Sequence, residues 1–251
     1  MAIGDSYHKL IELRREGLRK YRAQTVFDVC APPFRVSFPT IGLRQPDMPY
    51  KKFGPVYVGD NPPILAVVER CVRASTRALT VLEIGPGPGS LAFFLKRRYG
   101  ARIARYFALE RDEAVEGPYD RIPSPEAVPA GVDLLIASEV AEHMTADDFF
   151  GGILASVLRK LAPDAAMVLG TPNALSPGAI FRDVTHVQGY PWYDLYALMR
   201  LSFASVDIYR MHYATSETHI LGLIPRIVMT APLDLDWCEN LVCHARQPII
   251  Q

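Results

Sequence analysis

The chain has 251 residues, of which 49% are hydrophobic and 22% are charged, a balance that is ordinary for a soluble globular protein. Lys plus Arg and Asp plus Glu number 27 each, so no excess charge favours a nucleic-acid partner or a membrane surface. This length accommodates one large α/β domain, or one domain with an extension.

The cysteines and the hydropathy indicate where the protein is expected to act. Cys30, Cys71, Cys238 and Cys243 form no Cys-x-x-Cys pair, so we expect buried thiols rather than a zinc site or a redox dithiol. The last two cysteines, with His244, are a weaker candidate for a partial metal site. The sequence has no apolar run of about 18 residues and no signal-peptide pattern. We therefore expect a cytoplasmic protein without a membrane span.

The first predicted element is a charged helix over residues 6–22, whose broken apolar stripe is surrounded by arginines and lysines. It is either a docked helix with a solvated face, or a lid or surface for an acidic partner. Residues 30–63 follow and are rich in proline and aromatic residues. Because disordered segments lack aromatic content, we expect an ordered but irregular segment that packs on the main domain and could cover the active site. Residues 1–63 are thus interpreted as an extension of a domain over residues 64–251.

The main domain is predicted to alternate strands and helices. Asp60 or Asn61 caps a first helix, which runs to about Ala74. The expected strands lie near residues 80–85, 103–109, 133–137, 167–169, 206–209 and 241–245. The expected helices lie near residues 90–99, 146–161 and 192–200, with Pro163 ending the second of these. This alternation predicts an α/β fold with a doubly wound, mostly parallel sheet.

The most informative segment reads Glu-Ile-Gly-Pro-Gly-Pro-Gly, from Glu83 to Gly89. A short aliphatic strand stops at three glycines spaced two apart, and an amphipathic helix follows at once. Glycine allows positive φ and lets a ligand approach the main chain closely. The helix N-terminus adds unpaired N–H groups and the positive end of a dipole. The segment predicts a site for a nucleotide-like ligand, in which Glu83 could serve a cationic or amine-bearing group.

The spacing Glu83-x-Gly85-x-Gly87-x-Gly89 resembles motif I of the class I S-adenosylmethionine-dependent methyltransferases. Residues 133–144, 158–173 and 183–195 are similar, in the same order, to further blocks of that family. They are most similar to a branch with ubiquinone-biosynthesis-type, sugar and natural-product O-methyltransferases. The resemblance implies a Rossmann-like methyltransferase fold with a seven-stranded-type sheet and S-adenosyl-L-methionine as cofactor. It further implies methylation, favouring O-methylation, of a small-molecule, sugar or lipid-linked acceptor.

The resemblance also implies roles for individual residues. Glu110 ends the second strand, where the family holds the ribose hydroxyls of the cofactor, although it could instead be one of a solvated charge cluster. The residues expected at the cofactor are Glu83, Ile84, Gly85, Pro86, Gly87, Gly89, Glu110, Ser138 and Glu139. His143 and His186 are candidate general bases, because histidine suits proton transfer near neutral pH, and the alternative for each is a structural hydrogen bond. No metal site is predicted.

Two stretches depart from the family pattern. Four prolines lie in residues 116–131, so the helix expected there is missing or reduced to a turn. Asp120 or Glu126 could replace the usual acidic residue beside the adenine. Residues 211–236 match no block and could shape the acceptor pocket. The alternative functions are a catalytically silent cofactor-binding protein or, less favoured because the third glycine comes early, an NAD-type oxidoreductase.

Overall fold

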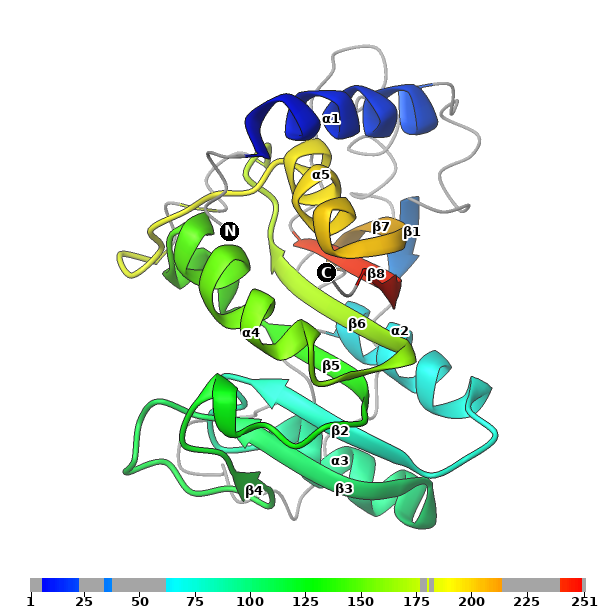
Figure 1. Cartoon of the computed structure of the whole chain (residues 1–251), viewed down its shortest axis with the longest axis vertical. Coiled ribbons are helices and arrows are strands. Elements are labelled where there is room, and N and C mark those ends of the chain that lie inside the picture. The colour runs from blue at the N-terminus through cyan, green and yellow to red at the C-terminus, as the bar shows by residue number, and fades with distance from the viewer. Residues whose placement is uncertain are drawn as a thin grey trace.

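The computed structural model describes residues 6–22, 34–37, 62–176, 180, 183–213 and 240–249. One sheet contains eight strands in the order β1-β7-β8-β6-β5-β2-β3-β4 (Figure 1). The strands are β1 (Phe34–Ser37), β2 (Leu79–Ile84), β3 (Ile103–Leu109), β4 (Asp120–Arg121), β5 (Val132–Ser138), β6 (Leu161–Pro172), β7 (Phe203–Tyr213) and β8 (Asn240–Pro248). Among these described strands, β8 alone runs antiparallel to its neighbours, β6 and β7. The predicted doubly wound, mostly parallel sheet is confirmed, and β1 adds an unexpected edge strand parallel to β7.

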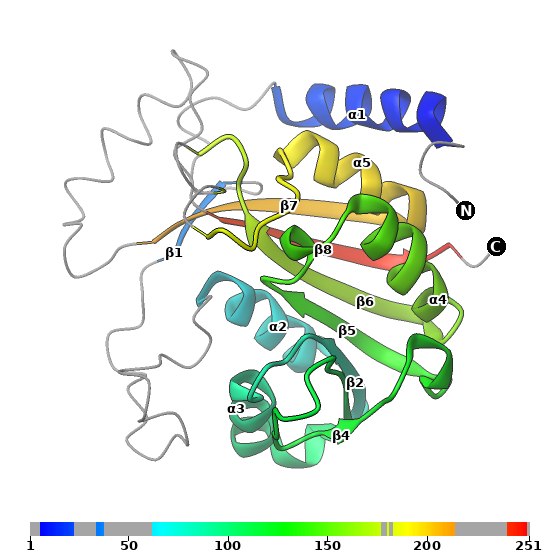
Figure 2. The same cartoon turned by 90° about the vertical axis from the view of Figure 1, so that its left-hand side faces the viewer.

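Helices cover both faces of the sheet (Figure 2). They are α1 (Tyr7–Arg22), α2 (Pro62–Ala74), α3 (Ser90–Tyr99), η4 (Gly100–Arg102), η5 (Pro125–Ala127), η6 (Ala141–His143), η7 (Asp147–Leu154), α4 (Ala155–Leu158) and α5 (Trp192–Ser202). The apolar faces of α2 and α3 pack on one side, around Val68 and Leu95. Those of η7, α4 and α5 pack on the other, around Leu154 and Met199. None of the described helices is long and apolar enough to cross a membrane.

The predicted N-terminal helix is present and docks on α5. The Nε of Arg14 lies 3.0 Å from Oδ1 of Asp194, and the Tyr196 hydroxyl donates to Oε1 of Glu16 over 2.6 Å. Gly17 allows this approach, because a Cβ there would lie 2.8 Å from the Tyr196 ring. The docked-helix interpretation is therefore confirmed. The Pro- and aromatic-rich residues 30–63 lie outside the described residues, apart from β1 and the start of α2.

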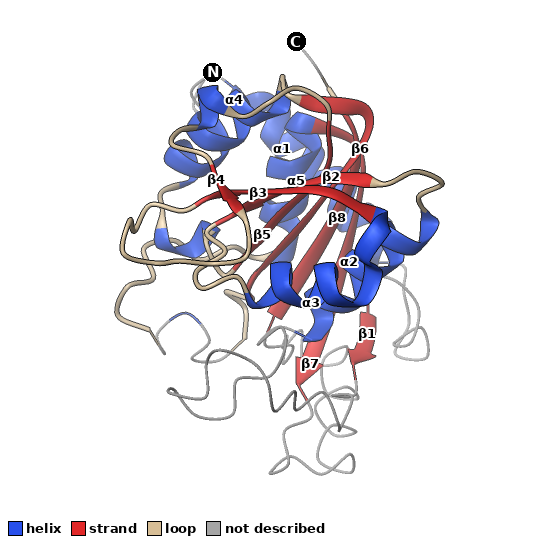
Figure 3. Ribbon diagram, turned by 90° about the horizontal axis from the view of Figure 1, so that it is seen from below, coloured by secondary structure: helices blue, strands red, loops and turns tan. Residues whose placement is uncertain are grey.

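The connection from β3 to β5 contains no full helix, as predicted. Between Leu109 and Val132 the chain forms only the two-residue strand β4 and the short 3₁₀ helix η5 (Figure 3). The prolines explain this, because each removes a backbone donor that a helix interior needs. The loop that precedes β4 therefore lies beside the carboxyl end of β2 without a helical scaffold of its own.

The helix predicted over residues 146–161 ends earlier than expected. It forms as the π-helix η7 followed by α4, which ends at Leu158, and β6 begins before Pro163. The β5–β6 register jumps from Val132↔Leu161 to Leu134↔Ala166, so the residues around Pro163 make no β5 pair. Such a bulge tolerates proline within a strand. The assignment of Pro163 as the helix terminator was therefore wrong.

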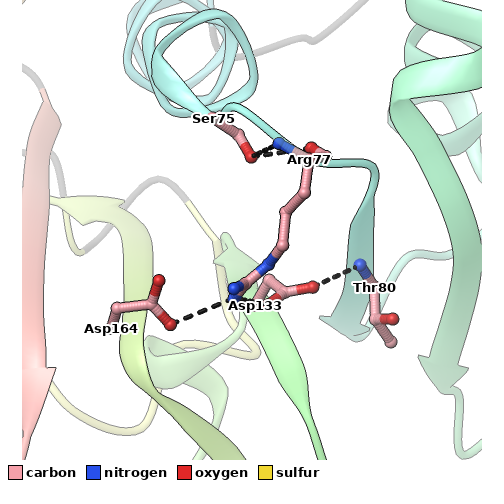
Figure 4. A network of polar contacts seen from close by, with 5 residues as sticks. All are labelled: Ser75, Arg77, Thr80, Asp133 and Asp164. Carbon is pink, nitrogen blue, oxygen red and sulfur yellow. Dashed lines mark hydrogen bonds and ion pairs between the residues drawn. The ribbon is translucent and has the colours of Figure 1, made fainter.

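The amino ends of the parallel strands are joined by an ionic network (Figure 4). Arg77, in the turn between α2 and β2, donates to Asp133 at the start of β5 and to Asp164 in β6. The second oxygen of Asp133 accepts the Thr80 N–H over 2.8 Å. Each carboxylate at this edge thus has a partner of opposite charge or a backbone donor.

The two cysteines that the structure describes are free thiols, as expected. Cys243 is buried in β8, and Cys71 is partly buried on α2. The sulfur of Cys71 lies 3.4 Å from Nε2 of His244. Burial raises the pKa of Cys71 to about 11 and lowers that of His244 to about 4, so both groups are neutral near pH 7. Cys30 and Cys238 lie outside the described residues.

Candidate functional site

The carboxyl ends of the parallel strands meet at one edge of the sheet, where doubly wound folds bind ligands. β2 ends at Ile84, β3 at Leu109, β5 at Ser138 and β6 at Pro172. The antiparallel strand β8 begins at the same edge, because Asn240 pairs with Pro172. The ends of these strands and the segments that follow them contain every residue that the sequence predicts for the site.

The three glycines of the turn after β2 differ in their surroundings: two are closely packed and one is open. All three of its glycines have positive φ, with φ 50° at Gly87. A Cβ on Gly85 would lie 2.6 Å from the Val140 side chain, and one on Gly89 would lie 2.7 Å from Pro118. A Cβ on Gly87 would meet no heavy atom of the described residues within 4 Å. Gly87 is therefore where a ligand can approach the main chain, and α3 begins directly behind it at Ser90.

Glu110 lies beside this turn, as the sequence predicts. Its Oε2 accepts the Gly87 N–H over 3.0 Å, and its Oε1 accepts the Asp112 N–H over 2.9 Å. The turn is also tied to β3, because the Gly85 N–H donates to the Leu109 carbonyl over 2.9 Å. Glu110 is thus not one of the freely solvated charges. Glu126, by contrast, interacts with Ser156 of α4.

Glu83 is buried beneath the turn, with 4% of its surface exposed. The Tyr106 hydroxyl donates to its Oε2 over 2.5 Å. Burial raises the pKa of Glu83 to about 7, the Tyr106 hydrogen bond acts in the opposite direction, and the charge of Glu110 adds to the rise. Its neighbour Ile84 is buried in the core with 3% exposure, so only its main chain faces the turn. Pro86 is half-buried within the turn.

Ser138 and Glu139 end β5 next to this turn. Glu139 has φ 54°, which a residue other than glycine rarely adopts, and its N–H donates to the Gly170 carbonyl over 3.0 Å. Its Oε1 accepts from the Asn240 amide over 2.8 Å. Ser138 is half-buried and pairs with Gly170 in β6. Backbone strain of this kind is frequent at ligand sites, because the surrounding structure must enforce it.

Glu142 is fully buried in η6. Its Oε2 accepts from the Thr171 hydroxyl over 2.9 Å, whereas its Oε1 has no hydrogen-bond partner among the described residues. Burial raises the pKa of Glu142 above its usual range, and the charge of Asp183 contributes in the same direction. The Glu142 carbonyl accepts from the N–H groups of Val187 and Gln188, which docks the loop containing His186 on η6.

His143 and His186 lie side by side, with ring centroids 4.9 Å apart. Nδ1 of His186 lies 3.0 Å from the Ile180 carbonyl, so we assign a proton to that nitrogen. Nδ1 of His143 lies 2.9 Å from the Thr185 hydroxyl, which itself donates to Asp183 over 2.7 Å. The same reasoning assigns a proton to Nδ1 of His143. With Nδ1 protonated, the neutral form of each ring presents an unprotonated Nε2, as a general base or a metal ligand requires.

The two histidines and Glu142 also form a group with metal-ligand geometry. One ligand atom from each of the three residues lies within 4.8 Å of the others. Each Nδ1 hydrogen bond is of the kind that orients a metal-binding imidazole. The sequence predicts no metal site, and it assigns no role to Glu142 although Glu142 lies between two predicted site residues. The acidic residue one position before His143 was the available signal.

No protein-family model matches the chain, and no curated protein is similar to it in sequence. Among solved structures, it is similar to a SAM-dependent methyltransferase from Archaeoglobus fulgidus, with 19% identity and a TM-score of 0.55 over 73% of this chain and 92% of that one. A chain from the Haloferax volcanii complex that contains the Trm112 methyltransferase activator matches with 11% identity and a TM-score of 0.51, over 72% and 89% of the two chains.

The fold is that of the S-adenosylmethionine-dependent methyltransferases. At these identities the likeness extends to the fold alone. The arrangement of the described strands from β7 to β4 and the glycine turn after β2 fit it, whereas β1 lies beyond those seven strands. The particular O-methyltransferase branch that the sequence resembles receives no separate support from these similarities.

Proposed function

We propose that this protein is an S-adenosylmethionine-dependent methyltransferase that methylates a hydroxyl group of a small-molecule, sugar or lipid-linked acceptor. The main supporting observation is that Glu110 is hydrogen-bonded to Gly87 at the open point of the glycine turn. A carboxylate there suits a vicinal diol, because its two oxygens can each accept a further hydrogen bond. The positive-φ turn and the N-terminus of α3 suit the rest of a nucleoside-like ligand.

In this proposal the chain's own residues bind and orient the reactants. When bound, S-adenosylmethionine supplies a methyl group activated by its positively charged sulfur. Glu110 would accept from the ribose hydroxyls, and Gly85, Gly87 and Gly89 would let the ligand lie against the main chain. Buried Glu83 would favour a cationic ligand, and Ser138 and Glu139 would form the wall at the end of β5. The acceptor would lie toward η6 and the 183–190 loop.

The proposed base is the unprotonated Nε2 of His143 or His186, which would take the proton from the acceptor hydroxyl. The hydrogen bonds at both Nδ1 atoms support this role, because they leave Nε2 as the acceptor. The residues proposed as lid and pocket wall, 30–63 and 211–236, lie largely outside the described residues and stay a prediction.

A specific observation favours a second role for the same group. Oε1 of Glu142 is buried without a hydrogen-bond partner among the described residues, and one ligand atom from each of Glu142, His143 and His186 lies within 4.8 Å of the others. A carboxylate and two imidazoles suit a divalent transition-metal ion, which could orient or acidify an acceptor hydroxyl. Under this second proposal the histidines are ligands and not bases.

Calorimetric titration tests the proposed cofactor. S-adenosylhomocysteine should bind wild type, whereas Gly87→Val should bind it much more weakly, because the side chain would enter the ligand's space. Gly100→Val is the matched control, since Gly100 also has positive φ and open surroundings but lies at the opposite end of α3. Equal affinity of wild type and Gly87→Val would contradict the proposal. Binding of a nicotinamide nucleotide instead would favour an oxidoreductase.

A further inference from the structure

The loop between β3 and β4 replaces a helix, and three of its backbone carbonyls accept hydrogen bonds from one side chain. Arg121 Nη1 donates to the carbonyls of Glu110 and Asp112 over 2.8 and 3.1 Å, and its Nη2 donates to the Val115 carbonyl. A helix would bond these carbonyls internally, whereas a loop must find other donors. A planar guanidinium with five N–H donors can serve several carbonyls at once.

This arrangement fixes the direction of the Glu110 carboxylate. Its oxygens accept from the N–H groups of Gly87 and Asp112, one from the glycine turn and one from the loop. Each carboxylate oxygen can accept a second hydrogen bond. With respect to the described residues, the carboxylate therefore keeps one further acceptor position on each oxygen, in a fixed orientation. That pattern matches the two hydroxyls of a vicinal diol.

A second contact joins the loop to the turn. The Tyr119 hydroxyl donates to the Gly87 carbonyl over 2.8 Å. The Tyr119 ring packs so close to the turn that a Cβ on Gly89 would lie 3.0 Å from it. Both the N–H and the C=O of Gly87 are thus bonded to the loop, so loop and turn form one unit.

We propose that Arg121 and Tyr119 are positioning residues that hold Glu110 and Gly87 in the geometry that selects a ligand with a vicinal diol. The inference rests on the proposed cofactor role of Glu110 and deepens it. Neither residue needs to touch the ligand. Arg121 acts through the carbonyls of Glu110 and of the loop that follows it, and Tyr119 acts through the Gly87 carbonyl. The loop in which the family's helix is missing thereby becomes part of the site.

The test combines two changes, the replacement of a protein side chain and the removal of the ligand's two ribose hydroxyls, and compares the resulting affinities. Calorimetry measures the affinity of wild type for S-adenosylhomocysteine and for its 2′,3′-dideoxy analogue. Wild type should prefer the diol by about tenfold or more, the size expected for hydrogen bonds to a charged group. Arg121→Gln should reduce this preference to about twofold, and Tyr119→Phe should reduce it severalfold. A role in overall stability alone would weaken both ligands equally and leave the preference unchanged.

Arg102→Gln is the matched control. Arg102 Nη1 donates to the carbonyls of Val72, Arg73 and Ser75 at the end of α2, far from the glycine turn. This variant should keep the full preference for the diol. If Arg121→Gln does not unfold cooperatively, Arg121→Lys replaces it, because a single ammonium cannot serve three carbonyls in a plane.

The outcomes separate the two proposals. An undiminished preference in the folded Arg121 variant would overturn the positioning role while leaving the cofactor proposal intact. An undiminished preference for the diol in Tyr119→Phe would show that Tyr119 has no positioning role. Failure of wild type to bind S-adenosylhomocysteine would overturn the proposed function, and this inference with it.

Discussion

The carboxylates at the amino ends of the parallel strands (the amino edge) have different partners from those at the carboxyl ends (the carboxyl edge). At the amino edge, Asp133 and Asp164 share the guanidinium of Arg77, and Asp133 also accepts a backbone N–H. At the carboxyl edge, Glu83 and Glu142 are buried more deeply, and they accept hydrogen bonds from the hydroxyls of Tyr106 and Thr171 instead of from a guanidinium. Burying a carboxylate without a cation is costly.

This difference distinguishes a structural charge network at the amino edge from a candidate binding site at the carboxyl edge. Paired charges at the amino edge connect the starts of β2, β5 and β6 and need nothing from outside the chain. Unpaired buried acids at the carboxyl edge lower the stability of the free protein and are compensated when a cationic ligand or a proton arrives. Perturbed carboxylates in such a position are typical of functional sites, although structural networks can also perturb them.

The largest expected effect concerns the histidines of the carboxyl edge. Replacing the true base among His143 and His186 with alanine should lower turnover by about 10²–10⁴-fold, the usual contribution of a general base, while cofactor affinity stays near wild type. The measurements are turnover, once an acceptor is known, and S-adenosylhomocysteine affinity. His244→Ala, in β8 beside Cys71 of α2, is the control and should keep its turnover. Losses of only a few-fold in both variants would make these histidines structural.

Chelation distinguishes a base from a metal ligand. If the histidines act as bases, turnover should survive prolonged treatment with a chelator. If Glu142, His143 and His186 hold a divalent ion, turnover should vanish with the chelator and return when Mn²⁺ or Zn²⁺ is added. Direct titration of Zn²⁺ into wild type and Glu142→Gln gives a readout that needs no acceptor. Binding by wild type alone would support the metal role.

The next effect is on stability and concerns Glu83. Its pKa is about 7 in the folded protein against a usual value near 4.5, so the folded state holds an extra proton between these pH values. The free energy of unfolding should therefore fall as pH rises through this window. Above pH 7, Glu83→Gln should regain up to roughly 3 kcal/mol relative to wild type, at about 1.4 kcal/mol per pKa unit.

Denaturant unfolding at pH 5 and pH 8 measures the effect of Glu83→Gln. The control is Glu126→Gln, because Glu126 is exposed and its pKa is lowered, so it is charged in both the folded and the unfolded state from pH 5 to pH 8 and the variant should keep the wild-type pH dependence. A Glu83→Gln variant with the same pH dependence as wild type would show that Glu83 is charged in the folded protein throughout this range.

The predicted effect on cofactor affinity is of similar or smaller size. Glu110→Ala should lose hydrogen bonds to a charged group worth about 1.5–3 kcal/mol, or at least about a tenfold loss of S-adenosylhomocysteine affinity. Asp133→Ala, the amino-edge counterpart, should lower the melting temperature and leave the affinity unchanged. Calorimetry and thermal unfolding on both variants check the contrast. An affinity loss in Asp133→Ala equal to that in Glu110→Ala would remove the distinction between the edges.

The smallest effect is expected for Arg77→Gln. Its side chain is more than half exposed, so solvent screens both ion pairs. The variant should lower the melting temperature slightly and leave ligand affinity unchanged. A large loss of stability would indicate that Asp133 and Asp164 depend on Arg77 more strongly than this exposure suggests.

Regular periodicity explains which parts of the fold the sequence could predict. β2, α3 and β3 were predicted within one residue of their observed bounds, because aliphatic runs and glycines mark their ends. The missing helix before β5 could be predicted from its prolines. The extent of β6 could not, because its bulge depends on pairing with β5. β1 has no local signal, since only β7, far along the chain, makes it a strand.

The candidate site also contains some residues that the sequence could predict and others that it could not. The glycine turn and Glu110 follow from local spacing, and the structure brings them together. The contact between Asn240 and Glu139 depends on β8 inserting antiparallel beside β6, which no short motif encodes. Arg121 was also missed, because its role appears only once the loop has no helix to satisfy its carbonyls. Long-range partners of this kind are specified by topology and not by sequence patterns.

The pairing of β1 with β7 has a consequence for how the chain folds. Phe34 pairs with Arg210, a separation of 210 − 34 = 176 residues. Contacts so distant in sequence form slowly, because a long loop must close first. Until β1 arrives, β7 is an open edge with unpaired backbone groups that can pair with another chain. During synthesis the segment that protects this edge is made early, but it can act only after β7 has been made.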